Sequence, residues 1–119
     1  GVQTCALPIS ADSICLTDEF RDRTLVVENV FNYLELLKKL YNNKKIGTIL
    51  LEAGGCLVRE FLKAGLVDEW VGFYAPIIIG GGTDGVAPGP FLEHEAYLEQ
   101  PVVNIFGDDV CIRGDICYR

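Results

Sequence analysis

The sequence predicts an α/β fold in which a strand–helix–strand unit precedes a C-terminal antiparallel hairpin. The first observation is the stretch 48–82, where an apolar run, two glycines, a helical pattern and a β-rich run follow one another. Segments in this order are typical of a βαβ unit with a right-handed crossover. The second observation is a pair of β-rich runs around Gly107-Asp108-Asp109, which is typical of a hairpin. The length of 119 residues suits one domain.

The elements before residue 48 are two short strands and a helix. Apolar and β-branched residues predict strands at Ser13–Leu16 and Thr24–Val27. Asn29 is expected to cap the helix, because its side chain can accept a hydrogen bond from an amide of the first turn. The helix is expected to end within residues 42–45. Its apolar stripe consists of Val30, Tyr33, Leu34, Leu37 and Leu40.

The βαβ unit begins with Thr48–Leu51, a run with the length and composition of a buried strand. Apolar residues then recur at helical spacing, with charged residues on the opposite face. Gly65 stands where a helix ends in a left-handed residue, which glycine adopts without a Cβ penalty. The second strand region is Trp70–Tyr74 with Ile77–Ile79. The apolar helix positions are Leu57, Val58, Phe61, Leu62 and Leu66.

The rest of the chain is predicted to be a loop followed by the hairpin. Glycines and prolines indicate a loop at Gly80–Pro90, and Phe91–Leu98 is expected to contain a short helical turn. The hairpin strands are predicted at Val102–Phe106 and Val110–Arg113. We interpret Asp108-Asp109 as turn formers rather than an acid–base or metal pair, because aspartate tolerates the backbone angles of turns.

Gly54 and Gly55 stand between the first strand and the helix of the unit. The first amides of a helix have no partner within it, and the helix dipole makes this end partly positive. Glycines let a phosphate approach closely, so these two residues and the amides of Cys56–Val58 form a candidate phosphate site. The alternative is that the glycines only permit a tight turn. The spacing, which is neither GxGxxG nor a P-loop, leaves both interpretations open.

Composition argues against several classes of protein. The net charge of −7 argues against a nucleic-acid partner, and no apolar run approaches the roughly 20 residues of a membrane helix. The five cysteines form no CxxC motif or disulfide-dense pattern, which favours the cytoplasm. With the single His94 they lack the spacing of a zinc site. No histidine lies near Cys56 in the sequence, so we expect it to have a packing or turn role rather than act as a nucleophile.

Four features in order resemble the signature of one protein family. They are the turn that begins at Glu52, the segment Ala64–Glu69 (AGLVDE), Ala75-Pro76 before glycines, and Gly107–Val110 (GDDV). From about Ser13 to its last residue, the chain resembles the reductase domain of bifunctional riboflavin biosynthesis proteins, the RibD C-terminal family.

The resemblance implies a dihydrofolate-reductase-like fold, with a mostly parallel sheet flanked by helices and a C-terminal antiparallel hairpin. It implies NADPH-dependent reduction of the ribosyl group of a phosphorylated pyrimidine, 5-amino-6-(5-phosphoribosylamino)uracil, to ribityl. Glu52 matches a substrate-binding glutamate of the family. Where members often have Gly-Pro-Thr or Gly-Gly-Thr, this chain has Gly55-Cys56, which weakens one hydroxyl contact to phosphate but keeps the backbone amides. The segment that matches the lining of the NADPH phosphates is Gly54, Gly55, Cys56, Leu57, Val58, Arg59 and Glu60.

The first nine residues, GVQTCALPI, resemble the translation of a common sequencing adapter. We therefore expect residues 1–9 to be a scar and residues 10–119 to be the C-terminal part of a RibD-like reductase domain, truncated at the N-terminus. The catalytic residues are expected in the absent half, so the chain alone is expected to lack turnover. The full-length protein is expected to be a cytoplasmic homodimer.

Two other functions remain open at this point. One is a different NADPH-dependent reductase of the same fold, acting on a folate-like or pterin-like substrate. The other is a non-catalytic nucleotide-binding module, in which the glycine turn is structural. The chain gives no support to a deaminase function, since it lacks the His-x-Glu and Pro-Cys-x-x-Cys zinc elements.

Overall fold

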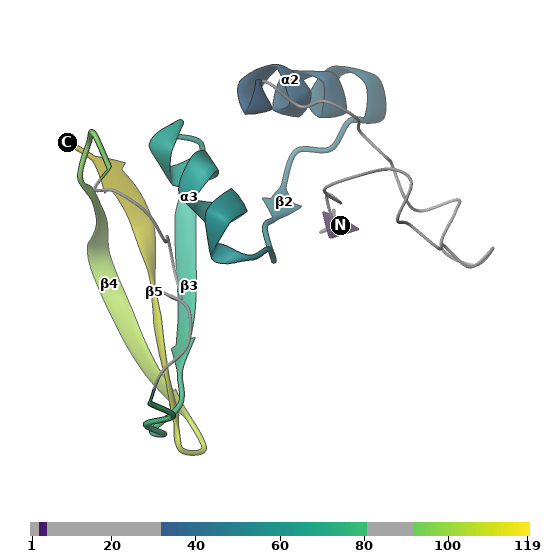
Figure 1. The fold of residues 1–119 in the computed structure, drawn as a ribbon. Helices are drawn as coiled ribbons and strands as arrows, with labels where there is room; N and C mark the ends of the chain where they lie inside the picture. The colour runs from purple at the N-terminus through teal and green to yellow at the C-terminus, as the bar shows by residue number, and fades with distance from the viewer. Residues whose placement is uncertain (1–2, 5–31, 81–91) are drawn as a thin grey trace. The chain divides into compact units, whose positions relative to one another are not determined.

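The structure is a computed structural model, which describes residues 3–4, 32–80 and 92–119 (Figure 1). The chain divides into two compact units, residues 1–54 and residues 55–119. The predicted strands at 13–16 and 24–27 lie outside the described residues, as does the loop over 81–90. The first unit contains β1 (Gln3–Thr4), α2 (Tyr33–Lys44) and β2 (Ile49–Leu50). The second contains α3 (Gly55–Lys63), β3 (Glu69–Tyr74), β4 (Ala96–Phe106) and β5 (Asp109–Tyr118).

Helix α2 begins after Asn32, so the predicted cap at Asn29 is wrong. Asn32 has an extended backbone, and its Oδ1 accepts a hydrogen bond from the amide of Glu35 at 3.2 Å, as an N-cap does. Asn29 and Asn32 are both asparagines, three positions apart, so the residue preference for N-cap positions alone does not indicate which of them caps the helix. The end of the helix is confirmed, because Lys44 is its last residue and Lys45 is left-handed, with a φ of 57°.

The buried face of α2 differs from the predicted stripe. Leu36 and Leu40 are buried, whereas Leu34 is 45% exposed. The prediction included Leu34 and omitted Leu36. Leucines occur on more than one face of this helix, so periodicity did not identify the buried one.

Helix α3 follows the prediction closely. Phe61 and Leu62 are its buried residues, and both belong to the predicted apolar face. Gly65 has a φ of 65°, and its amide donates to the carbonyl of Leu62 at 3.0 Å. The amide of Leu66 donates to the carbonyl of Phe61, also at 3.0 Å. These two bonds and the left-handed glycine constitute a Schellman motif, which satisfies carbonyls that the last helical turn leaves free.

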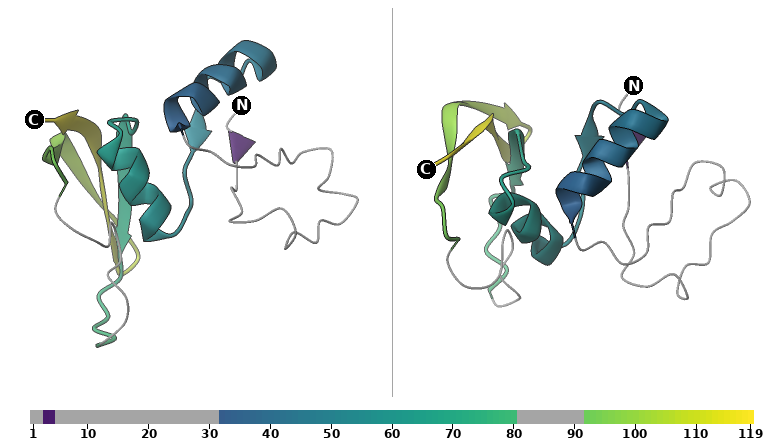
Figure 2. Two further views of the ribbon diagram at one scale, coloured as in Figure 1. Left: turned by 45° about the horizontal axis from the view of Figure 1, so that its top comes forward. Right: turned by 90° about the horizontal axis from the view of Figure 1, so that it is seen from above.

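The second unit is built on an antiparallel sheet of order β3-β5-β4, in which β5 lies between the other two strands (Figure 1). Figure 2 shows its twist from two further sides. Strands β4 and β5 form the predicted hairpin, and the two-residue turn Gly107-Asp108 connects the paired residues Phe106 and Asp109. Gly107 has a φ of 63° and Asp108 does not have a positive φ, which is the pattern of a type II′ turn. The interpretation as a turn residue therefore fits Asp108, whereas Asp109 is the first residue of β5.

The hairpin is longer than predicted. Residues Ala96–Leu98 pair with Ile116–Tyr118, so the helical turn expected within Phe91–Leu98 is wrong for these residues. Ala96 and Leu98 are half-buried and Tyr97 is exposed, the alternation of a strand with one covered face.

The second strand of the predicted βαβ unit ends earlier than expected. β3 stops at Tyr74, and Ile77–Ile79 have no strand structure. Pro76 explains the ending, because it has no amide to donate to a neighbouring strand. Ile78 is 99% exposed.

The predicted mostly parallel sheet is not observed in the described residues. Parallel pairing there is limited to β1 and β2, two residues each, whereas β3 pairs antiparallel with β5. β2 and β3 thus belong to different sheets. Both residues of β1 lie within residues 1–9, which are expected to lie outside the domain. The origin of residues 1–9 stays a prediction.

Candidate functional site

The glycine turn lies immediately before α3. Gly54 is exposed, and no atom lies within 4 Å of the position that a Cβ would occupy there. Gly54 and Gly55 also lack a positive φ. Neither packing nor backbone conformation therefore requires a glycine at position 54, which argues against a purely structural reason for it. A glycine at position 54 leaves open space beside the first amides of α3.

Among the described residues, no side chain accepts a hydrogen bond from the first amides of α3. At α2 the side chain of Asn32 caps the helix, but the residue before α3 is Gly54, which has none. The first turn of α3 also contains no acidic residue. The amides of Gly55, Cys56 and Leu57 have no intrahelical partner, and the dipole gives this end a partial positive charge. The end of α3 is therefore suited to an anion such as a phosphate.

The predicted cofactor-binding residues are Gly54, which precedes α3, and the first six residues of α3, but they are not equally available. Cys56 and Glu60 are exposed, whereas Leu57, Val58 and Arg59 are half-buried. Leu57 and Val58 can offer an anion only their backbone amides. Arg59 contributes the positive side chain closest to the turn in sequence, and Glu60 contributes a negative one.

The predicted substrate-binding residue, Glu52, is exposed and lies two residues after the end of β2. Ligands in α/β proteins bind beyond the carboxyl ends of strands, which is where Glu52 stands. Two residues, Ala53 and Gly54, separate it from Gly55 in the sequence.

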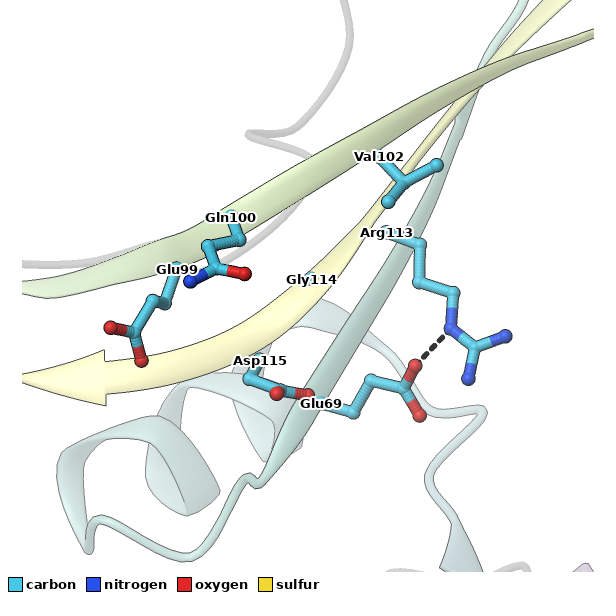
Figure 3. A pocket seen from close by; sticks show the side chains of 7 residues that line it. All are labelled: Glu69, Glu99, Gln100, Val102, Arg113, Gly114 and Asp115. Carbon is cyan, nitrogen blue, oxygen red and sulfur yellow. Dashed lines mark hydrogen bonds and ion pairs between the residues drawn. The ribbon is translucent and has the colours of Figure 1, made fainter.

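A cavity of about 360 Å³, which the sequence did not predict, lies on the three-stranded sheet (Figure 3). It lies beside a β-bulge, where Gln100 and Pro101 on β4 together face Gly114 on β5. Gln100 has a φ of 45°, an uncommon value for a residue with a side chain. The Gln-Pro pair within a β-rich run was the signal in the sequence, since proline in a strand marks an edge or a bulge. The cavity is lined by Glu69, Glu99, Gln100, Val102, Arg113, Gly114 and Asp115.

Carboxylates dominate the cavity. Glu69, Asp115 and Glu99 are directly paired in register across β3, β5 and β4. Arg113 forms an ion pair with Glu69, which raises the pKa of the Arg113 guanidinium (Figure 3). The Sγ of Cys117 donates a hydrogen bond to Glu99 at 3.2 Å, which raises the pKa of the thiol. Three carboxylates and one arginine give a negative lining, which repels a phosphate.

Two kinds of site are not found in the described residues. Within 32–80 and 92–119, no group of three or more His, Cys, Asp or Glu side chains has a geometry that could hold a metal ion. In the same part of the chain no helix has the length and apolar character needed to span a membrane.

Comparison with known proteins identifies the family. Residues 9–112 match the RibD C-terminal domain. The chain belongs to the RibD C-terminal domain family. The match contains Glu52 and the whole glycine turn, whereas Arg113, Gly114 and Asp115 of the cavity lie beyond its last residue.

Individual relatives agree with the family. The riboflavin biosynthesis protein RibD of Escherichia coli (strain K12) is 34% identical over 95 residues, which are 76% of this chain and 26% of that protein. The chain thus spans about a quarter of the length of this relative.

Two solved structures share the fold. Acinetobacter baumannii RibD (form 2) has a TM-score of 0.64 at 24% identity, over 87% of this chain and 30% of that one. The crystal structure of a putative riboflavin biosynthesis protein from Shewanella sp. PV-4 has a TM-score of 0.64 at 22% identity, over 91% of this chain and 58% of that one. The described elements thus belong to a RibD-like fold.

Proposed function

We propose that this RibD C-terminal domain chain is part of an NADPH-dependent reductase of riboflavin biosynthesis. The whole protein would reduce the ribosyl group of 5-amino-6-(5-phosphoribosylamino)uracil to ribityl. Membership of the family supports this reaction class, and the riboflavin biosynthesis protein RibD of E. coli is a relative at 34% identity. Because the chain spans 26% of that protein, the proposal concerns the activity of the whole protein.

The start of α3 is the proposed binding site for the phosphates of NADPH. The observation that carries this proposal is the start of α3 behind Gly54, a glycine that neither packing nor φ requires, with no capping side chain among the described residues. The amides of Gly55, Cys56 and Leu57 would donate to phosphate oxygens, with the amide of Val58 completing the first turn. The negative cavity on the sheet is a poor alternative for the same anion.

The bound NADPH would supply the hydride, and the residues of this chain would bind and orient the reactants. Holding the pyrophosphate at a fixed helix end restricts where the nicotinamide can lie. Glu52, an exposed carboxylate, is proposed to accept hydrogen bonds from sugar hydroxyls or pyrimidine N–H groups. A carboxylate repels the phosphate of the substrate, so the contact from Glu52 would be to the neutral part of the molecule.

The cofactor site is tested by measuring NADPH binding to the 119-residue chain and to Gly54→Asp. Aspartate is a favoured N-cap, so this variant is expected to fold at least as stably as the parent. Its carboxylate would occupy the amides and repel the phosphates. One charge pair about 4 Å apart is worth about 1 to 4 kcal/mol between bulk water and a protein surface. The Kd should therefore rise about 5-fold or more.

Gly47→Asp is the matched control for this experiment. Gly47 is also exposed, has open space around its Cβ position and lacks a positive φ, but it precedes β2 rather than a helix. The same added charge at position 47 should leave the Kd within about twofold of the parent value, since a residue that precedes a strand cannot cap the free amides of a helix. Equal Kd values for the parent and Gly54→Asp would contradict the proposed phosphate site.

The reaction is tested separately, by following NADPH oxidation with the authentic substrate. The catalytic residues are proposed to lie in a part of the protein that this chain does not include. Binding of NADPH without substrate-dependent oxidation is therefore the expected outcome. Robust oxidation by the 119-residue chain would contradict this assignment of the catalytic residues.

A further inference from the structure

Arg59 lies one helical turn after the proposed phosphate site. It stands four residues after Gly55, the first residue of α3 (Figure 1). A helix rises about 5.4 Å per turn, and its side chains lean toward its N-terminus. The side chain at position 59 therefore extends over the turn that contains Gly55 and Cys56. Because Gly55 has no side chain, the Arg59 guanidinium can lie beside this turn and close to its amides.

The Arg59 guanidinium has no partner in the part of the chain that the structure describes. It forms no hydrogen bond or ion pair with a residue of 32–80 or 92–119. Glu60 follows it in the sequence, but consecutive residues of a helix do not face each other. The positions that do face a helical residue lie three and four residues away, and none of them is acidic here. They are Gly55, Cys56, Leu62 and Lys63.

Arg59 also differs from the other cation of α3. Arg59 is half-buried, whereas Lys63 is exposed. A half-buried side chain has fewer orientations open to it, so Arg59 loses less conformational entropy when it binds a ligand. Its guanidinium is planar and presents its N–H donors in a fixed arrangement that matches a phosphate group. The side of the first turn of α3 is therefore suited to a second anion, apart from the one at the helix end.

NADPH carries two separate anionic groups. Its pyrophosphate is proposed to bind the amides at the end of α3. Its 2′-phosphate, on the adenosine ribose, is the group that NADH lacks. In dinucleotide sites an arginine near the ribose is a recurrent means of binding the 2′-phosphate. Arg59 has the charge, the free donors and the position beside the helix end that this group requires.

We infer that Arg59 binds the 2′-phosphate and makes the site selective for NADPH over NADH. The inference rests on the proposed function, because it concerns the same cofactor at the same helix. It deepens that proposal by assigning the choice between the two nucleotides to one side chain.

Titration calorimetry of the 119-residue chain with NADPH and with NADH tests the inference. The parent is expected to bind NADPH about tenfold or more tightly than NADH. Arg59→Gln removes the charge, so its Kd for NADPH should rise about tenfold or more. Its Kd for NADH should stay within about twofold of the parent value, which shows that the helix end is intact. Arg59→Lys keeps the charge but loses the planar arrangement of donors, so its Kd for NADPH should be intermediate.

Lys63→Gln is the matched control, because it removes the same charge one turn farther from the start of α3. It should leave both Kd values within about twofold of the parent values. Equal affinity of the parent for the two nucleotides, or an equal loss for both in Arg59→Gln, would overturn the inference and leave the amide site in place. An equal loss of NADPH affinity in Lys63→Gln would do the same. A parent chain that binds neither nucleotide would overturn the phosphate site of the proposed function and this inference with it.

Discussion

The bulge in β4 makes a strong prediction for Gly114. A Cβ at this position would lie 3.2 Å from the carbonyl oxygen of Glu99, 3.3 Å from the Cβ of Leu98 and 3.4 Å from the Cα of Pro101. Two of these three atoms belong to the backbone of the bulge and cannot move aside as a side chain would. Gly114→Ala should therefore force β4 and β5 apart locally.

The magnitude follows from two opposing effects. Inserting a methyl group into a tightly packed region costs about 1–3 kcal/mol. Replacing glycine lowers the entropy of the unfolded chain, which stabilises the protein by about 0.4–1 kcal/mol when there is no strain. We expect a net loss of about 1–2 kcal/mol, which lowers the Tm by about 4 °C per kcal/mol for a domain of this size.

Trp70 is a direct probe of this change. It is the single tryptophan of the chain, and it pairs in register with Gly114 across β3 and β5. Its fluorescence in thermal or urea unfolding should show the lower stability of Gly114→Ala. Gly47→Ala, at a position with open space, should leave this transition unchanged or slightly stabilised. Equal or greater stability of Gly114→Ala would refute the reasoning about the bulge.

Two further predictions concern the C-terminal strand. The hydroxyl of Tyr118 donates to the carbonyl of Val67 and accepts from its amide, both at 3.0 Å, so Tyr118→Phe should cost about 1–2 kcal/mol in urea unfolding. Tyr41→Phe, at an exposed position of α2, should have no measurable effect. Alkaline pH should also destabilise the fold, because burial raises the pKa of Tyr118 and the hydrogen bond to Glu99 raises the pKa of Cys117. Both groups hold their protons more tightly in the folded state than in the unfolded state. The free energy of unfolding is therefore constant at lower pH. It falls above about pH 8.5, where the Cys117 thiol of the unfolded chain ionises, and again above about pH 10, where the Tyr118 hydroxyl does. Tyr118→Phe should abolish the loss of stability above about pH 10. A free energy of unfolding that does not depend on pH up to about 11 would contradict the raised pKa values of both groups.

The features that the sequence predicted correctly are determined locally. Gly65 ends α3 because a left-handed residue is needed two positions after the last helical one, and glycine adopts that conformation readily. Gly107-Asp108 forms the hairpin turn for a similar reason. Both depend on neighbours within a few residues, which periodicity and turn preferences describe well.

The features that were missed depend on contacts between distant residues. Glu69 and Arg113 are 44 positions apart, and their ion pair exists because β3 and β5 are neighbours. No local pattern indicates that pairing, so the ion pair and the carboxylate lining of the cavity were not predicted, although Gln100-Pro101 was a signal for the bulge itself. Gln100 has a backbone conformation that its residue type rarely adopts, so its role in the bulge was not apparent either.

The central claim is that the first amides of α3 bind the phosphates of NADPH. The most direct measurement is a titration of the isotope-labelled chain with NADPH, followed through the NMR signals of its backbone amides. The account predicts that the largest shifts occur at Gly55, Cys56 and Leu57 and that they are lost in Gly54→Asp. Shifts concentrated around Glu99 and Asp115, or none along the start of α3, would contradict it.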